Sequence, residues 1–171
     1  LNSWNQDRLT LIILEKLFGT LTEKKIGILG FSFKANTNDT RESPAIQICK
    51  NLLREGASLK IHDPKVSKEQ MALDLGIPSI EECLKNEDIN NKYKDKKWEK
   101  SLLDDEFFEN LDAVIVLTEW EIYSCINWEK AAKKMRAPGW VFDSRLILDE
   151  KRVINSGLSF WRVGVGTLKI N

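Results

Sequence analysis

The sequence has 171 residues, of which 42% are hydrophobic, and this length fits one domain that can bury a sizeable core. Lys plus Arg and Asp plus Glu each number 26, so the net charge is zero and no overall positive field exists to hold a nucleic acid. A single nucleotide needs only a local cationic pocket, so small anionic ligands are not excluded.

A helix is the first predicted element, over residues 3–18. Four of its apolar residues keep helical spacing: Leu9, Ile12, Ile13 and Leu17. Three others widen the apolar surface beyond one stripe: Leu11, Leu14 and Phe18. A helix that is apolar on more than one side usually packs against more than one neighbour. The alternative is a helix that simply covers the sheet of its own domain.

The next stretch, residues 24–44, predicts a buried strand, a polar loop and the start of a helix. The strand shows no polar alternation, as expected where both faces of a parallel sheet are covered. Ser43 as N-cap and Pro44 at the first helical position mark the helix start. Such strand–loop–helix junctions bind anions, because backbone N–H groups at the helix start are unpaired. Lys34 and Arg41 add two cations to the loop, which favours a phosphate-bearing ligand over an ordinary solvated connection.

Residues 58–62 predict a second strand, and two short helices follow. Ser67 and Ser79 each begin a capping-box pattern, which marks a helix start. Between about 84 and 106 the chain is rich in Lys, Asp and Glu and poor in apolar residues. This composition predicts a solvated excursion rather than core, and its mixed signs argue against a nucleic-acid patch.

Strands and helices alternate through the rest of the chain. Apolar residues 111–117, 140–142 and 158–163 predict three more strands. Asn127 caps a helix between the first two of these, and another helix covers about 148–155. The alternation predicts the fold class α/β with a largely parallel sheet.

Sheets of this kind bind ligands outside the carboxyl ends of their strands. The residues just beyond those ends are 31–34, Asp63, 118–120 and 143–145. Lys34 and Arg145 can therefore converge on one crevice, although they are far apart in the sequence. A pyrophosphate suits such a pair, with Lys as a point charge and Arg as a planar fork. Phe33 is the nearest aromatic residue and could either pack on a base or sugar or cover the loop.

The cysteines do not indicate a metal or redox site. Cys49, Cys83 and Cys125 form no Cys-x-x-Cys pair and His62 is the only histidine, so we expect no zinc site. Scattered thiols favour a reducing, cytoplasmic compartment. No apolar run approaches the length of a membrane span, and we expect no membrane partner. The chain begins without Met and almost at once enters a helix, which suggests a piece of a longer protein.

Several separate motifs follow one another in an order that resembles a known family: residues 30–34, 39–43, 61–65, 117–120 and 142–145. Gly-Phe-Ser-Phe-Lys followed by Asp-Thr-Arg-Glu-Ser resembles the start of the C-terminal, UDP-sugar-binding domain of the UDP-glucose/GDP-mannose dehydrogenase family. The resemblance covers nearly the whole chain except much of 77–106. It implies a three-layer Rossmann-like domain over 21–171, preceded over 1–20 by the end of an inter-domain connecting helix.

Carried over position by position, the resemblance implies that Phe33, Lys34 and Arg145 contact the UDP-sugar. It also implies that Arg41 reaches an NAD cofactor bound mainly by another domain. The family oxidises the sugar C6 alcohol to a carboxylate in two NAD-dependent steps, and the loop motif with Thr118-Glu119-Trp120 favours UDP-glucose as substrate and UDP-glucuronate as product. A homo-oligomer is implied for the full-length enzyme.

Two features that the family needs for its chemistry are missing from the sequence. Gly27 and Gly30 give only Gly-x-x-Gly, so no dinucleotide fingerprint exists, and no cysteine matches the family's catalytic surroundings. We therefore expect no catalytic residue here and no activity of the chain alone. Two alternatives stay open, a sibling dehydrogenase for GDP-mannose or a UDP-N-acetylhexosamine and a non-catalytic α/β interaction module. Receiver-type modules need carboxylates after the first strand, and residues 30–32 supply none.

Overall fold

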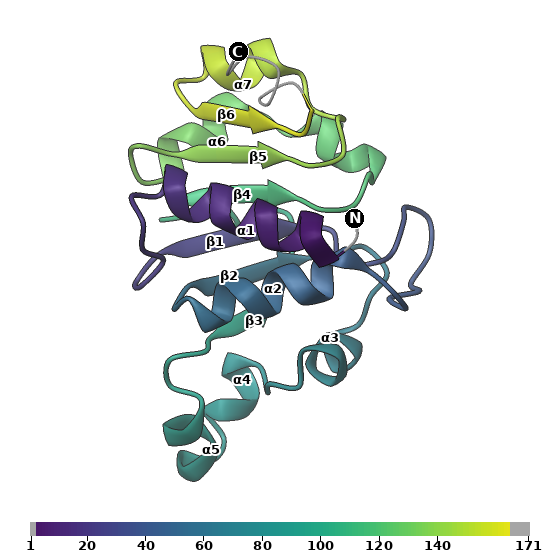
Figure 1. The fold of residues 1–171 in the computed structure, drawn as a ribbon, viewed down its shortest axis with the longest axis vertical. Helices are drawn as coiled ribbons and strands as arrows, with labels where there is room; N and C mark the ends of the chain where they lie inside the picture. Colours follow the sequence, from purple (N-terminus) through teal and green to yellow (C-terminus); the bar gives the residue numbers. More distant parts are fainter. Residues whose placement is uncertain (1–2, 165–171) are drawn as a thin grey trace.

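The computed structural model describes residues 3–164. Residues 1–2 of the predicted connecting segment 1–20 and residues 165–171 of the predicted domain 21–171 lie outside the described part. Six strands form one sheet in the order β3-β2-β1-β4-β5-β6, and every neighbouring pair is parallel. The arrowheads of β4, β5 and β6, which are in plain view in Figure 1, accordingly point to the same edge. The strands are β1 Lys25–Leu29, β2 Ser58–His62, β3 Trp98–Lys100, β4 Ala113–Val116, β5 Trp140–Asp143 and β6 Ser159–Arg162.

Helices cover both faces of the sheet and make three layers. Helices α1 (Ser3–Lys16) and α2 (Pro44–Arg54) lie side by side on the face turned to the viewer in Figure 1, and α6 (Trp128–Lys134) lies behind it. Residues of β4 alternate between the two layers of core: Ala113 and Ile115 join one apolar cluster, and Val114 and Val116 join the other. The fold class α/β, three-layered with a parallel sheet, is confirmed.

Several elements begin and end where their local sequence signals predict. In α2, Ser43 Oγ accepts a hydrogen bond from the N–H of Ala45 at 3.3 Å, and Pro44 is the first helical residue. Ser67 and Ser79 cap α3 (Lys68–Leu75) and α4 (Ile80–Cys83) in the same way. Two further helical elements are the 3₁₀ turn Glu121–Cys125, which the sequence did not predict, and α7 Glu150–Asn155.

The first helix is two residues shorter than predicted. It stops at Lys16 because Phe18 and Gly19 have φ of 68° and 82°, and the N–H of Gly19 donates back to the Leu14 carbonyl at 2.7 Å. One stripe of the helix is buried against the sheet, as shown by Leu9 and Ile13, whereas Leu11 is 64% exposed. The helix therefore does cover its own sheet, and its second apolar side faces outward.

The prediction of a solvated excursion over residues 84–106 is wrong in part. This segment forms α5 (Glu87–Lys92) and the edge strand β3, and Trp98 at the start of β3 is completely buried. Its indole Nε1 donates to the Ile77 carbonyl at 2.9 Å. One large apolar residue among lysines decides the packing here, because pairing with β2 turns it into the core. Within residues 3–164 no helix is long and apolar enough to cross a bilayer.

Candidate functional site

The strand register brings four loops to one edge of the sheet. Leu29 of β1 is level with His62 of β2 and Val116 of β4, and Val116 is level with Asp143 of β5. The chain leaves β1 toward β2 on one side, while β4 lies on the other side, so the sheet reverses its winding between β1 and β4. Ligands of open parallel sheets bind at such a reversal.

A pocket of about 610 Å³ opens at this edge. It is lined by Gln6 of α1, by Phe33 and Lys34 of the loop after β1, by Glu42, Ser43 and Pro44 at the start of α2, and by Arg145 of the loop after β5. The structure thus brings Phe33, Lys34 and Arg145 to one pocket, as the ends of the strands predicted. Phe33 is 45% exposed, so part of its side chain is accessible to a ligand.

Gly30 lets the loop after β1 pass directly beside β4. Its φ is +100°, and a Cβ at this position would lie 2.3 Å from Cβ of Thr118. Thr118 Oγ1 then donates to the Ser32 carbonyl at 2.9 Å, and Ser32 Oγ donates to the Lys34 carbonyl at 2.9 Å. These two hydrogen bonds fix the backbone of the loop that carries Phe33 and Lys34, and the one between Thr118 and Ser32 is buried.

The buried carboxylate of Asp63 ties the loop after β1 to the loop after β2. Its Oδ2 accepts from the N–H groups of Phe31 at 2.8 Å and Ser32 at 2.9 Å, and its Oδ1 accepts from Lys65 and Val66 at 2.9 and 3.0 Å. Burial would raise the pKa of Asp63, but these four N–H groups together hold it below its usual value. The ionised carboxylate of Asp63 therefore holds together the loops after β1 and β2, and the first of these loops carries the pocket residues Phe33 and Lys34.

Asp143 likewise binds backbone N–H groups of the loop that carries Arg145. Its Oδ1 accepts from the N–H of Arg145 at 2.9 Å, and its Oδ2 accepts from Ile147 and Leu148 at 2.9 and 2.8 Å. The strand ends in the sequence predict both aspartates at the ligand edge but indicate no role for either. An Asp directly after a buried strand is the available signal, since such side chains often bond to the backbone of the next residues.

Arg145 is held by a carboxylate, Glu119, for which the sequence predicts no role. Its Nη2 forms an ion pair with Oε2 of Glu119, which follows β4, and Oε1 of Glu119 accepts from the N–H of Ala35 at 3.2 Å. Burial would raise the pKa of Glu119, but the hydrogen bond from Ala35 and the charge of Arg145 hold it lower. Knowledge of the strand order would have suggested this contact, because β4 lies between β1 and β5.

The structure does not bring Arg41 to the pocket with the other three predicted site residues. Its side chain is 89% exposed and pairs with Asp39, the distance from Nη2 to Oδ2 being 2.8 Å. The guanidinium lowers the pKa of Asp39 to about 2. Arg41 is thus a fully charged, outward-facing group close to the start of α2.

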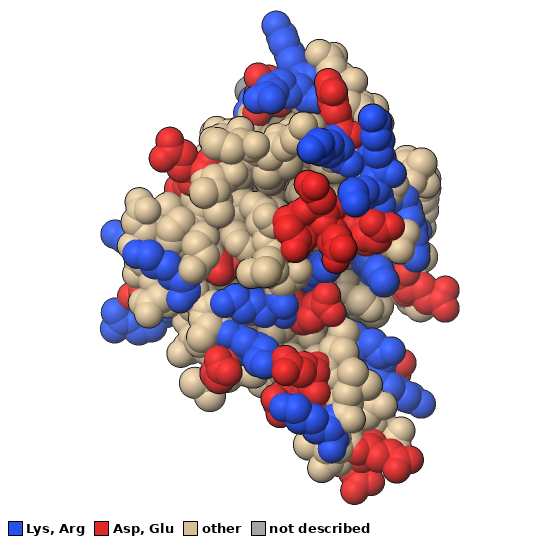
Figure 2. All heavy atoms as spheres, turned by 180° about the vertical axis from the view of Figure 1, so that it is seen from behind, with Lys and Arg blue, Asp and Glu red and all other residues tan. Residues whose placement is uncertain are grey.

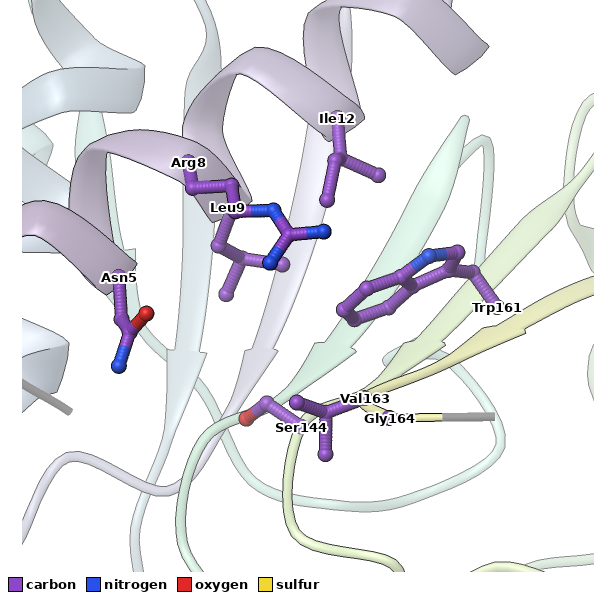
Figure 3. A pocket seen from close by; sticks show the side chains of 8 residues that line it. All are labelled: Asn5, Arg8, Leu9, Ile12, Ser144, Trp161, Val163 and Gly164. Carbon is purple, nitrogen blue, oxygen red and sulfur yellow. The ribbon is translucent and has the colours of Figure 1, made fainter. Parts of the chain in front are cut away.

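A second pocket, of about 200 Å³, lies beside the first and was not predicted. Figure 3 shows Asn5, Arg8, Leu9 and Ile12 of α1 on one side of it and Ser144, Trp161, Val163 and Gly164 on the other.

Away from this edge the surface charge is mixed: on the back of the molecule, Lys and Arg are interspersed with Asp and Glu (Figure 2). Charge of one sign is not concentrated there, which agrees with a local pocket rather than a surface for a polyanion.

The comparison with known sequences fits this geometry. Residues 27–150 match the model described as the UDP-glucose/GDP-mannose dehydrogenase family, UDP binding domain. The chain belongs to this family. The matched range runs from β1 to the first residue of α7, and it includes Phe33, Lys34, Arg41 and Arg145. The resemblance drawn from the sequence motifs is confirmed.

Relatives in the family are considerably longer than this chain. The UDP-glucose 6-dehydrogenase of Gallus gallus is 39% identical over 150 residues, which are 88% of this chain and 29% of that protein. The UDP-glucose 6-dehydrogenase of Drosophila melanogaster is 37% identical over 164 residues, which are 96% of this chain and 33% of that protein. The chain thus spans about a third of the length of these relatives.

A solved structure shares the fold. The NDP-N-acetyl-D-galactosaminuronic acid dehydrogenase of Methanosarcina mazei Go1 superposes with a TM-score of 0.69 over 94% of this chain and 29% of the other. The two sequences are 24% identical, so the superposition shows the fold alone. Membership in the family rests on the match of the domain model and on the longer relatives.

Proposed function

We propose that this chain is the C-terminal, UDP-sugar-binding part of an NAD-dependent UDP-glucose 6-dehydrogenase, called the full-length enzyme below. That enzyme would oxidise UDP-glucose with two NAD⁺ and water to UDP-glucuronate and two NADH. The observation that carries the proposal is the pocket at the winding reversal of the sheet, lined by Phe33, Lys34 and Arg145 inside the family's UDP binding domain.

The pocket has the chemistry that a nucleoside diphosphate requires. Lys34 and Arg145 supply an ammonium and a planar guanidinium, which together suit the two charged phosphates. The exposed ring of Phe33 offers an apolar surface for the base or the sugar. Asp63 and Asp143 fix the loops that carry these groups, so the cationic side chains start from ordered backbone.

Titration of the 171-residue chain with UDP, followed by NMR chemical shifts of the loop amides, tests the proposal directly. Shifts should concentrate on residues 31–35 and 144–146 and should saturate, although binding is expected to be weak because the rest of the full-length enzyme supplies further contacts. GDP serves as the comparison, since a preference for GDP would favour the sibling that acts on GDP-mannose. No response to either nucleotide contradicts the proposal.

The first connection of the sheet does not suit the main site for NAD. A dinucleotide fold needs a short glycine-rich turn from its first strand into a helix that faces the pyrophosphate. Here β1 and α2 are separated by the long loop 30–43, and Ser43 already occupies the N–H of Ala45. In our proposal NAD is bound mainly outside this chain, and the exposed Arg41 extends toward it. NAD supplies the hydride acceptor when bound.

The chain alone, mixed with UDP-glucose and NAD⁺, should produce no NADH. The reason is that it has neither the dinucleotide turn nor a cysteine in a suitable place, Cys49 being completely buried in the core. Absorbance at the NADH band measures the result, and the full-length enzyme under the same conditions is the positive control. Steady NADH formation by the chain alone would falsify this division of labour.

In the full-length enzyme, Arg41→Ala should raise the KM for NAD⁺ by about three- to ten-fold and change the KM for UDP-glucose less. The side chain is exposed and lies off the pocket, so its loss removes a solvent-screened contact, worth about 1 kcal/mol, from the cofactor alone. Asp39→Asn is the matched variant, because it frees the Arg41 guanidinium without removing it. An equal or larger effect on UDP-glucose contradicts the assignment of Arg41.

Further parts of the proposal concern the surroundings of the chain. The segment 1–20, which contains α1, would be the connection from this domain to the rest of the full-length enzyme, and the outward-facing Leu11 and Phe18 would contact parts outside the chain or another copy in a homo-oligomer. Cys49, Cys83 and Cys125 are all free, which supports a reducing, cytoplasmic compartment.

A further inference from the structure

Glu119 is in contact with both sides of the pocket that we assign to the UDP-sugar. One oxygen of its carboxylate accepts from the N–H of Ala35, directly after Lys34, and the other pairs with the guanidinium of Arg145. The side chains of Arg145 and Glu119 are 27% and 32% exposed, so the ion pair is partly shielded from water. The carboxylate of Glu119, in the loop after β4, therefore connects the loop after β1 with the loop after β5.

We propose that Glu119 is a positioning residue that holds the guanidinium of Arg145 ready for the phosphates of the sugar nucleotide. The inference rests on the proposed function, because it concerns the same pocket. Arg carries five N–H donors, and the pair with Glu119 occupies only one side of the fork, so donors remain for an anion. A free Arg side chain has to lose several rotamers on binding, whereas one already held by Glu119 has lost most of them.

The opposite effect is also physically conceivable, which makes the inference testable by its sign. A carboxylate beside the guanidinium cancels part of its charge and repels an incoming phosphate. If that effect governed the pocket, removal of the Glu119 charge would tighten binding. If positioning governs it, removal frees Arg145, and binding weakens by about three- to ten-fold, the cost of ordering one long side chain.

Glu119→Gln separates these effects with little change in shape. The amide keeps an oxygen that accepts from Ala35 but loses the charge that holds Arg145. In the full-length enzyme we expect the KM for UDP-glucose to rise about three- to ten-fold, with the KM for NAD⁺ unchanged. Glu119→Asp keeps the charge on a shorter side chain and should give a smaller rise.

A double-variant cycle decides whether Glu119 acts through Arg145. Adding Glu119→Gln to Arg145→Ala should have no further effect on the KM for UDP-glucose, because the group to be positioned is already gone. A merely structural role would add its full cost in both backgrounds. Glu109→Gln is the control for loss of a paired carboxylate elsewhere, since Glu109 pairs with Lys134, 3.8 Å apart, at the opposite edge of the sheet.

Three results would overturn the inference: an unchanged or lower KM for UDP-glucose in Glu119→Gln, an equal rise in the KM for NAD⁺, or an equal loss in the Arg145→Ala background. Failure of the proposed function looks different. In that case the unmodified full-length enzyme itself would not oxidise UDP-glucose, whereas failure of the inference leaves it active and leaves Arg145→Ala impaired.

Discussion

Replacing Lys34 or Arg145 with alanine in the full-length enzyme should weaken its use of UDP-glucose by about ten- to a hundred-fold or more. Each side chain lines the pocket and would donate a charge-assisted hydrogen bond to the diphosphate. Such a bond contributes roughly 1.5 to 3 kcal/mol net, which corresponds to that range of affinity. Arg145→Lys should recover only part of the loss, because an ammonium cannot reproduce the two parallel donors of a guanidinium.

Steady-state kinetics and direct titration with UDP-glucose measure this result. Lys65→Ala is the matched control, because Lys65 follows β2 at the same edge of the sheet but lines a different pocket. It should leave the affinity for UDP-glucose unchanged, which separates contact with the ligand from a general loss of positive charge. Wild-type affinity of both Lys34→Ala and Arg145→Ala would return these residues to the status of solvated loop cations.

Asp63→Ala should lower the free energy of unfolding by about 3 to 5 kcal/mol. The carboxylate accepts four backbone N–H groups, and at least those of Phe31, Ser32 and Val66 are buried. A buried donor left without an acceptor costs roughly 1 to 3 kcal/mol, and water that enters the space left by the side chain reduces the sum. Denaturant unfolding followed by circular dichroism measures the change.

The effect of Asp63→Ala should also depend on pH in a defined direction. Because the pKa of Asp63 is lowered in the folded protein, its charge stabilises the fold at pH values above the ordinary Asp pKa, 3.8. That contribution is lost as the pH falls through the lowered pKa of Asp63. The difference in the free energy of unfolding between wild type and Asp63→Ala should therefore narrow below about pH 4. The exposed Asp95→Ala should stay within about 0.5 kcal/mol of wild type. A gap that stays constant down to pH 2 contradicts the charged role.

Local signals in the sequence were sufficient for most of the fold. Ser43 and Pro44 start α2 at the predicted residue, because the cap and the missing N–H of proline act within one turn. The second strand has its predicted limits, because Pro64 has no N–H to donate to a neighbouring strand and the strand ends just before Asp63-Pro64. The parallel arrangement followed from the alternation of strands and helices, which leaves a crossover between successive strands.

Features decided by distant residues were missed. Trp98 appears as one aromatic residue among lysines, and only its pairing partner in β2 and the Ile77 carbonyl make it core. Glu119 and Arg145 are predicted at the same edge of the sheet, yet their ion pair depends on the order of strands, which no local pattern contains. Asp63 was assigned no role for the same reason, because two of its four partners precede β2 by a whole helix.

The wide separation of the pocket residues along the chain has a consequence for biosynthesis. Gln6, Lys34 and Arg145 meet only after the fifth strand has joined the sheet, and contacts between such distant residues form late because loop closure costs entropy first. A nascent polypeptide on the ribosome would therefore have no nucleotide pocket until nearly all of this domain had been synthesised. Ligand present during translation could stabilise only the completed product and could not guide the early steps of its maturation.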